Sequence, residues 1–275
     1  MKLKYLGTGG AEGIPGMFCN CDLCNFAREK RGKEIRTRNQ TVIDGRMLMD
    51  FPPDTYMHVI HGGLDLRGIH SCIITHSHHD HFDVKNFWCR IHFIANNVGE
   101  EPMRVYVTKD GYEKLVAEKT AEYPDDDRIV PVLVEPFVPF EAEGYRFIPL
   151  LANHDPASDP VFYIIEKDDK TLLYANDTGY FPDESWEYLK GYERSFDMIS
   201  FDCTCALRDL RNSHMGLITN GEVRDRLTEM GLCRPDTVIY TTHFSHNRAA
   251  PHDELVKAAA EYGFEVAYDG CEVEF

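Results

Sequence analysis

The sequence has no long apolar run, few basic residues and no repeat of fixed period. A membrane-spanning helix needs about 18 consecutive apolar positions, and no segment of the 275 residues supplies them. The chain carries 29 Lys and Arg against 46 Asp and Glu, a formal net charge of −17, so long nucleic acid is a poor partner. The opening MKLKYLGTGG contains no extended apolar stretch, so we expect no secretory signal. These absences predict a cytoplasmic globular protein without a membrane partner.

Cysteine is present, but it is unevenly distributed. There are nine cysteines, an odd number, and three of them are clustered in Cys19-Asn20-Cys21-Asp22-Leu23-Cys24. Thiolates this close together commonly hold a soft metal ion, and free thiols on a loop are the simpler alternative. The cluster therefore predicts a zinc-binding loop near residues 19–24. Four other cysteines are expected to be small core residues: Cys72, Cys89, Cys233 and Cys271.

Short apolar runs and a few helical segments alternate through both halves of the chain. Asp44-Gly45 indicates a hairpin, and a second hairpin is expected around Asp168-Asp169-Lys170. Strands are expected at Lys2–Leu6, Gln40–Val42, Met47–Asp50, Ser71–Thr75, Arg104–Thr108, Tyr145–Leu151, Val161–Glu166, Thr171–Tyr174, Met198–Phe201, Val238–Thr241 and Phe264–Tyr268. Helices are expected at Asp110–Glu122, Asn220–Met230 and His252–Tyr262. This order predicts an α/β fold, a four-layer αβ/βα sandwich forming one domain over residues 1–275.

Polar side chains come just after five of these expected strands. In layered α/β folds the loops after the strands meet at one edge of the sheets, and ligand sites form there. The pattern therefore predicts that these side chains lie close together. They are His76, His154, Asp177, Asp202 and His243.

The segment Thr75-His76-Ser77-His78-His79-Asp80-His81 is unusually rich in metal-binding side chains. Imidazole is a common ligand for zinc and related ions, and carboxylate oxygens suit harder ions. In a tight turn after a strand, His76 and His78 can face one centre while Asp80 and His81 face another. A solvated histidine-rich loop is the alternative, which the rarity of such clusters disfavours.

The same segment resembles the H-x-H-x-D-H signature of the metallo-β-lactamase superfamily. The superfamily pattern continues with a His, an Asp and a last His, which this chain supplies at His154, Asp177 and His243. The resemblance implies a hydrolase with two divalent ions, manganese or zinc, with iron or nickel as alternatives. It assigns the first ion to His76, His78 and His154, the second to Asp80, His81 and His243, and a bridge to Asp177. His79 is expected to point away from both ions.

Other motifs are similar to the PhnP-like branch of that superfamily, which includes phosphoribosyl cyclic phosphodiesterase. They are Leu6-Gly7-Thr8-Gly9-Gly10-Ala11, the cysteine cluster and Arg36-Thr37-Arg38. In that branch the corresponding cysteines bind a structural zinc, which implies the same role for Cys19, Cys21 and Cys24. The resemblance gives His246 as the fourth ligand, and Cys203 or Cys205 is the alternative. The glycines are expected to form a tight turn near the metals, because no nucleotide-binding motif fits them. The resemblance also suggests a homodimer.

The implied activity is that of a phosphodiesterase acting on a small cyclic or diester phosphate, by attack of a metal-bridging hydroxide. His214 would be the general acid, and Asp80 would assist proton transfer. Asp202 is expected to orient a ligand histidine. Arg208 and Arg248 could touch a phosphate, although an ordinary surface role is the commoner case for arginine.

Three alternatives stay open at this stage. A ribonuclease Z-like tRNA-processing nuclease would use the same ligands, but the acidic charge and the lack of a basic arm disfavour it. A carbonyl hydrolase, such as a lactonase or thioesterase, is disfavoured by the cysteine cluster and His214. A binding module without catalysis is disfavoured because no ligand of the superfamily pattern is missing. Trp88 and Tyr180 could line a substrate pocket, but packing in the core is the safer expectation for both.

Overall fold

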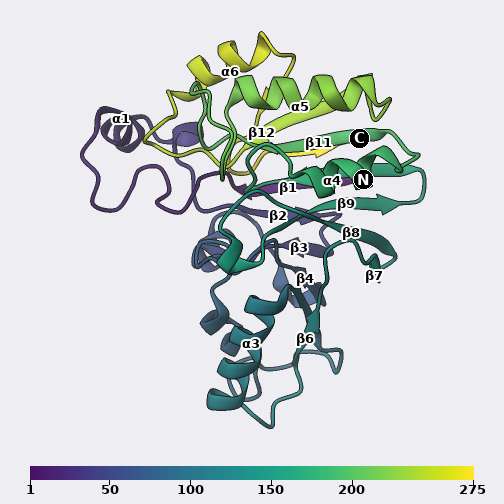
Figure 1. Ribbon diagram of the computed structural model, residues 1–275. Helices are drawn as coiled ribbons and strands as arrows, with labels where there is room; N and C mark the ends of the chain where they lie inside the picture. Colours follow the sequence, from purple (N-terminus) through teal and green to yellow (C-terminus); the bar gives the residue numbers. More distant parts are fainter.

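Two seven-stranded mixed sheets form the centre of the computed structural model, which describes residues 1–275 (Figure 1). The first sheet has the order β14 (Glu272–Glu274), β1 (Lys2–Gly7), β2 (Gln40–Ile43), β3 (Met47–Met49), β4 (Ser71–Ile73), β5 (Met103–Val107) and β6 (Ile129–Leu133). The second has the order β13 (Glu265–Val266), β12 (Cys233–Thr242), β11 (Phe196–Asp202), β10 (Lys170–Ala175), β9 (Val161–Lys167), β8 (Tyr145–Leu151) and β7 (Phe140–Ala142).

The chain forms six helices: α1 (Asp22–Lys30), α2 (Thr55–Ile60), α3 (Lys109–Glu122), α4 (Asp183–Lys190), α5 (Leu217–Glu229) and α6 (His252–Ala260). Of these, α3 packs against the first sheet, and α4, α5 and α6 pack against the second. In Figure 1, α5 lies along β11 and β12, whereas α3 lies beside β6 at the other end of the molecule. The helix α6 contacts β13. Short 3₁₀ helices occur at Gly32–Glu34, Leu66–Gly68, Val84–Arg90 and Pro156–Ser158. No helix combines the length and the apolar character that crossing a bilayer requires.

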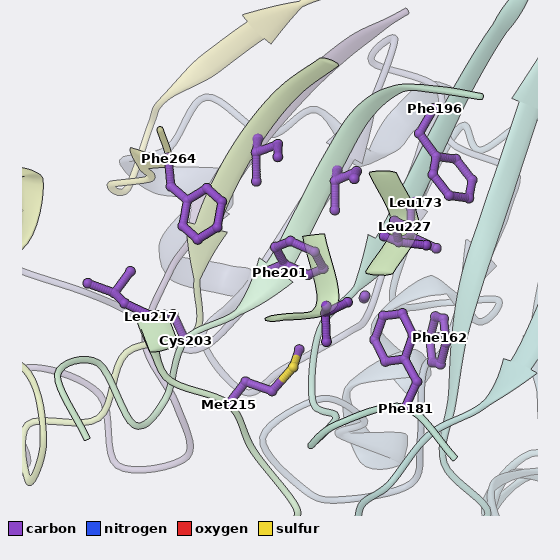
Figure 2. Close-up of a cluster of buried hydrophobic side chains, with 14 of the residues drawn as sticks. Phe162, Leu173, Phe181, Phe196, Phe201, Cys203, Met215, Leu217, Leu227 and Phe264 are labelled. Carbon is purple, nitrogen blue, oxygen red and sulfur yellow. The ribbon is translucent and has the colours of Figure 1, made fainter. Parts of the chain in front are cut away.

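The strand sequences explain why the sheets are buried on both faces. Along β9, Val161, Tyr163 and Ile165 join the core between the two sheets. The alternate residues Phe162 and Ile164 join the core between the second sheet and the helices. Because successive side chains of a strand point to opposite faces, a continuous apolar run fills both layers at once. Figure 2 shows the outer of these layers, with Phe162 and Phe181 in contact across it.

A third apolar cluster lies on the outer face of the first sheet. It contains Cys72, Val105 and Val107 from the sheet and Leu115 from α3. The molecule therefore has four layers, two of helices outside and two sheets inside. A buried apolar cluster joins each layer to the next. The predicted four-layer αβ/βα sandwich is confirmed. Each expected strand and helix is present, most of them with ends shifted by a few residues.

Several elements were not predicted. The edge strand β6 contains Pro131, which cannot donate to a ladder and is tolerated because only one side of the strand is paired. The strands β7 and β14 are only three residues long, and α2 and α4 span only two turns, so each has too few residues for a clear periodic pattern. The helix α1 begins within the cysteine cluster and continues beyond it to Lys30.

The glycine-rich segment after β1 passes very close to the chain at residues 36–38. A Cβ atom at Gly7 would overlap the carbonyl oxygen of Arg38, and one at Gly9 would lie 2.8 Å from the carbonyl oxygen of Arg36. The amide of Gly10 donates to the carbonyl oxygen of Phe244 at 3.0 Å, directly after His243. These glycines therefore allow a tight turn beside the predicted metal site, as the sequence suggested.

The close approach at Gly7 generates a stability prediction. Gly7→Ala should lower the free energy of unfolding by about 1–3 kcal/mol, because the new methyl group can be placed only by moving backbone. Urea denaturation followed by circular dichroism measures this change. Gly68→Ala is the control, since nothing lies within 4 Å of the added Cβ atom there. Equal stability of the two variants would contradict the close packing at Gly7.

Candidate metal centre

The structure brings the predicted ligands together at one edge of the sandwich. His76 and His78 follow β4, His154 follows β8, and His243 follows β12 directly. Asp177 follows β10, which lies in the middle of the second sheet. The expectation that side chains after the strands meet in space agrees with this arrangement.

The first set of ligand atoms consists of three imidazole nitrogens. Nδ1 of His78 lies 3.0 Å from Nε2 of His76 and 3.1 Å from Nε2 of His154. Three ring nitrogens cannot all be satisfied by sharing protons among themselves. All three nitrogens lie within 4.8 Å of one another, a spacing at which one divalent ion could bind them together.

The second set combines imidazole and carboxylate groups. Nε2 of His81 lies 3.2 Å from Nε2 of His243 and 3.3 Å from Oδ2 of Asp80. His81, His243 and Asp80 are all buried. Neutral imidazole together with carboxylate suits manganese, iron and zinc alike, so the donor atoms do not select one metal.

Asp177 lies between the two sets. Its Oδ2 atom is 2.7 Å from Nε2 of His81 and 3.0 Å from Nε2 of His243, and the carboxylate also groups with His76. These contacts are short but lack hydrogen-bond alignment, and the buried Oδ2 atom has no hydrogen-bond partner. A buried carboxylate oxygen without a donor is costly unless a cation satisfies it. Asp177 therefore fits a bridge between two ions.

The charges in the pocket point the same way. Burial opposes a positive charge on His81, yet the carboxylates of Asp177, Asp80 and Asp50 raise its pKa well above the ordinary value. Burial lowers the pKa of His76 well below that value, so this imidazole stays neutral and free to act as a ligand. The carboxylates thus demand positive charge in a place where divalent ions would supply it. The residues present fit two such ions.

The other ring nitrogen of every candidate ligand histidine has a protein partner. Such partners fix the ring orientation and leave one defined nitrogen free for the metal. The pairs are His76 with the Thr75 hydroxyl at 3.1 Å, His78 with Asp155 at 3.1 Å, His81 with Asp50 at 2.8 Å, His154 with the Ser213 carbonyl at 3.0 Å and His243 with the Thr204 hydroxyl at 2.7 Å. Asp202 reaches this shell as well, accepting a hydrogen bond from Thr204 at 2.9 Å and lying 3.5 Å from Nδ1 of His243.

Asp50 is a supporting residue that the sequence did not single out. It is fully buried directly after β3, and its Oδ1 atom accepts hydrogen bonds from the amide and hydroxyl of Thr75 at 2.8 and 2.9 Å. Its Oδ2 atom holds His81, so one carboxylate ties β3 to both ends of the histidine-rich segment. Asp50, like His76, is a polar residue at the end of an apolar strand. The same sequence pattern that predicts a functional role for His76 therefore applies to Asp50.

His214 lies beside the cluster, outside the two predicted ligand sets. Its Nδ1 atom is 3.0 Å from Oδ2 of Asp202 and 3.6 Å from Oδ1 of Asp177. Burial opposes the charge, but Asp202 raises the pKa of His214 to about 9. In this environment the imidazole carries a proton at neutral pH, as a proton donor must.

The cysteine cluster forms a second, separate group with His246. Nδ1 of His246 lies 3.5 Å from Sγ of Cys19 and 3.6 Å from Sγ of Cys21, and Cys24 completes a set whose ligand atoms all lie within 4.8 Å of one another. The amide of Cys24 lowers the pKa of the Cys21 thiol to about 6, which favours the thiolate that zinc binds. Four protein ligands leave no open position, as in a structural zinc site.

The rival fourth ligands lie elsewhere. Cys203, the residue after β11, is packed in the apolar core (Figure 2), and Cys205 lines a pocket beside His214. His79 is exposed and belongs to no ligand group, in line with the expectation for it. Two other expectations were wrong, because Cys89 is exposed and Trp88 is 45% exposed. Both lie on the 3₁₀ helix Val84–Arg90, where only Phe87 is buried.

A protein-family model described as a beta-lactamase superfamily domain matches residues 47–244, from β3 to the residue after His243. The chain belongs to the beta-lactamase superfamily. Superfamily membership and the buried cluster of histidines and aspartates together indicate a metal-dependent hydrolase.

Solved structures share the fold over the whole chain. A diphosphatase of the PhnP family has 24% identity and a TM-score of 0.75, covering 100% of this chain and 96% of the other. Zn²⁺-bound PqqB from Methylobacterium extorquens has 17% identity and a TM-score of 0.71, with 100% of each chain covered. Human tRNase Z, short form, has 13% identity and a TM-score of 0.64, with 100% and 99% covered. At these identities the likeness concerns the fold.

One curated relative matches a smaller part of the chain. An octanoyltransferase of Porphyromonas gingivalis (strain ATCC BAA-308 / W83) is 30% identical over 83 residues. The match spans 30% of this chain and only 16% of that protein. The activity of the larger protein therefore says nothing direct about this chain.

The cysteine cluster predicts a metal content. Wild-type protein purified without chelator should contain about three divalent ions per chain, and Cys21→Ser should lose about one of them. Plasma mass spectrometry of the purified proteins measures this. Cys89→Ser is the matched control, because Cys89 is exposed and belongs to no ligand group. Unchanged zinc in Cys21→Ser would refute a metal site at the cysteines.

The buried contact between Asp50 and His81 predicts an effect on metal affinity. Asp50→Asn should weaken metal binding at the histidine site by about 10–100-fold. The substitution replaces the carboxylate that orients the His81 ring with an uncharged amide. Titration of metal-free protein against a competing chelator gives the affinity. Asp65→Asn, at an exposed carboxylate bound only to Arg67, provides the control. Equal affinities in the two variants would show that Asp50 does not support the site.

Proposed function

We propose that the protein is a phosphodiesterase that hydrolyses a small cyclic or diester phosphate. One observation carries this choice among the hydrolases of the superfamily. A pocket of about 610 Å³ beside His214 is lined by Arg208 and Arg248. Neither guanidinium forms an ion pair or a side-chain hydrogen bond, although the chain contains 46 acidic residues. Arg31 and Arg46, both far along the chain from this pocket, are the other arginines without such a partner.

Two unpaired arginines beside a protonated histidine form a site for an anion. Guanidinium groups bind phosphate through paired, charge-assisted hydrogen bonds. Asn212 and Asn247 line the same pocket and add side-chain amides. In a protein of net charge −17 this local positive surface is what would draw an anionic substrate to the metal centre.

The chain's own residues divide the chemistry among them. When bound, two divalent ions supply a water nucleophile at neutral pH and neutralise charge on the non-bridging phosphate oxygens. One ion would be held by His76, His78 and His154. The other would be held by Asp80, His81 and His243. Asp177 would contribute to both. Asp202 holds Nδ1 of His214, so Nε2 remains available to donate a proton to the leaving oxygen.

The alternatives explain the arginine pocket less well. A lactone or thioester carries no charge at the reacting group, so unpaired arginines beside His214 would have no role in its hydrolysis. A tRNA substrate would require a broad basic surface, and the chain has 29 basic residues against 46 acidic ones. One structure with the same fold is a diphosphatase of the PhnP family. A diphosphate ester is therefore a second form that the proposed substrate could take.

A leaving-group comparison tests both the reaction and the role of His214. Protein loaded with Mn²⁺ or Zn²⁺ should hydrolyse bis(p-nitrophenyl) phosphate and 2′,3′-cyclic AMP. Asp80→Ala should lower kcat for both by about 10³-fold or more, because one ion loses its carboxylate. His214→Ala should lower kcat by about 10²-fold or more for the cyclic phosphate only, since p-nitrophenolate leaves without a proton.

His61→Ala is the control for the loss of a histidine, because His61 is exposed and belongs to no ligand group. Metal content is measured on each variant, so that a lost ion is distinguished from a lost proton donor. The proposal fails if fully metallated wild-type protein leaves every phosphodiester intact and hydrolyses a lactone or thioester instead.

A further inference from the structure

A second pocket, of about 420 Å³, reaches one of the candidate metal ligands. His154, proposed to hold the first ion, lines this pocket, which lies where the edge of the first sheet meets the second sheet. Its apolar wall comes from both sheets and from the loops between them. The wall residues are Leu133, Pro136, Leu151, Ala152, Pro160 and Pro182.

The walls of this pocket are fixed by backbone hydrogen bonds. The amide of Val134 donates to Val107 at 2.9 Å, and that of Phe137 donates to Pro149 at 2.7 Å, so the segment after β6 is attached to both sheets. On the far side the amide of Ala152 donates to Pro160 at 3.1 Å. Prolines restrict the backbone further. The pocket is therefore already formed before a substrate arrives, as small-molecule sites usually are.

The polar groups at the rim disfavour a second phosphate here. Two carboxylates, those of Glu135 and Asp159, line the pocket against one ammonium group, that of Lys109, so the local charge is negative. Lys109 and Glu135 form no ion pair with any residue, so one donor and one acceptor remain free at the edge of an apolar wall. Leu133 is 47% exposed, which leaves apolar surface that a bound group would cover.

We propose that this pocket binds an uncharged aromatic ring with polar edges, of the kind found in a nucleobase. The ring would be carried by the ester group that stays on phosphorus, while the leaving group lies toward His214. This inference rests on the phosphodiesterase function proposed above. A cavity of about 150 Å³ already holds benzene, so 420 Å³ accommodates a ring together with a sugar.

Three diesters with the same leaving group test the proposal: methyl, benzyl and n-octyl p-nitrophenyl phosphate. With metal-loaded wild-type protein, kcat/KM for the benzyl ester should exceed that for the methyl ester by about tenfold or more, from burial of the ring. Leu133→Glu should lower the benzyl-to-methyl ratio at least about fivefold, because a carboxylate replaces part of the apolar wall.

Val138→Glu is the matched control. Val138 lies in the same segment and is similarly exposed, at 52%, but it does not line the pocket, so its benzyl-to-methyl ratio should equal that of the wild type. Melting temperatures of both variants verify that the proteins are folded.

The possible failures are distinguishable. Equal kcat/KM for the methyl and benzyl esters, a preference for the octyl ester, or equal loss on all three esters in Leu133→Glu would each overturn the ring pocket while the phosphodiesterase activity stands. Absence of turnover of every diester would overturn the phosphodiesterase proposal itself, and the ring pocket with it.

Discussion

The carboxylate of Asp177, buried among imidazoles with one oxygen lacking any hydrogen bond, is the constraint around which this protein is arranged. Such a group is destabilising unless positive charge compensates it, and the fold provides no Lys or Arg there. The compensation has to come from bound ions or from a proton on His81, whose pKa is raised. Folding and metal binding are then linked, since the folded chain creates a site that the unfolded chain does not possess.

The two-sheet core is stable enough to hold the buried carboxylate of Asp177 in place. Strands buried on both faces, such as β9 and β10, are held by apolar contacts in two layers and cannot easily shift in register. Asp177 extends from the end of β10, and His243 from the end of β12, two strands away in the same sheet. The apolar layers thus supply the rigidity, and the loops after the strands supply the chemistry.

Much of this arrangement was predictable from the sequence, and the reasons differ from part to part. His76 to His81 form a dense motif, and His154, Asp177 and His243 each follow an apolar strand, so their meeting could be expected. Asp155 and Thr204 gave no such signal, because a single polar residue in a loop has many ordinary roles. The two pockets were not predictable, since residues far apart in the sequence line each one. The cytoplasmic location and the homodimer stay predictions.

The short segment from His243 to His246 serves two metal clusters at once. His243 belongs to the histidine and aspartate group, and His246 completes the cysteine group. Between them, the amide of Phe244 donates to the carbonyl oxygen of Thr8 at 2.9 Å, and its carbonyl oxygen accepts from the amide of Gly10. These two bonds fix the backbone between the two histidines. The turn after β1 therefore positions a ligand of each group, because it holds the residue that lies between them. A change in that turn would act on both groups at once, although Thr8 and Gly10 belong to neither.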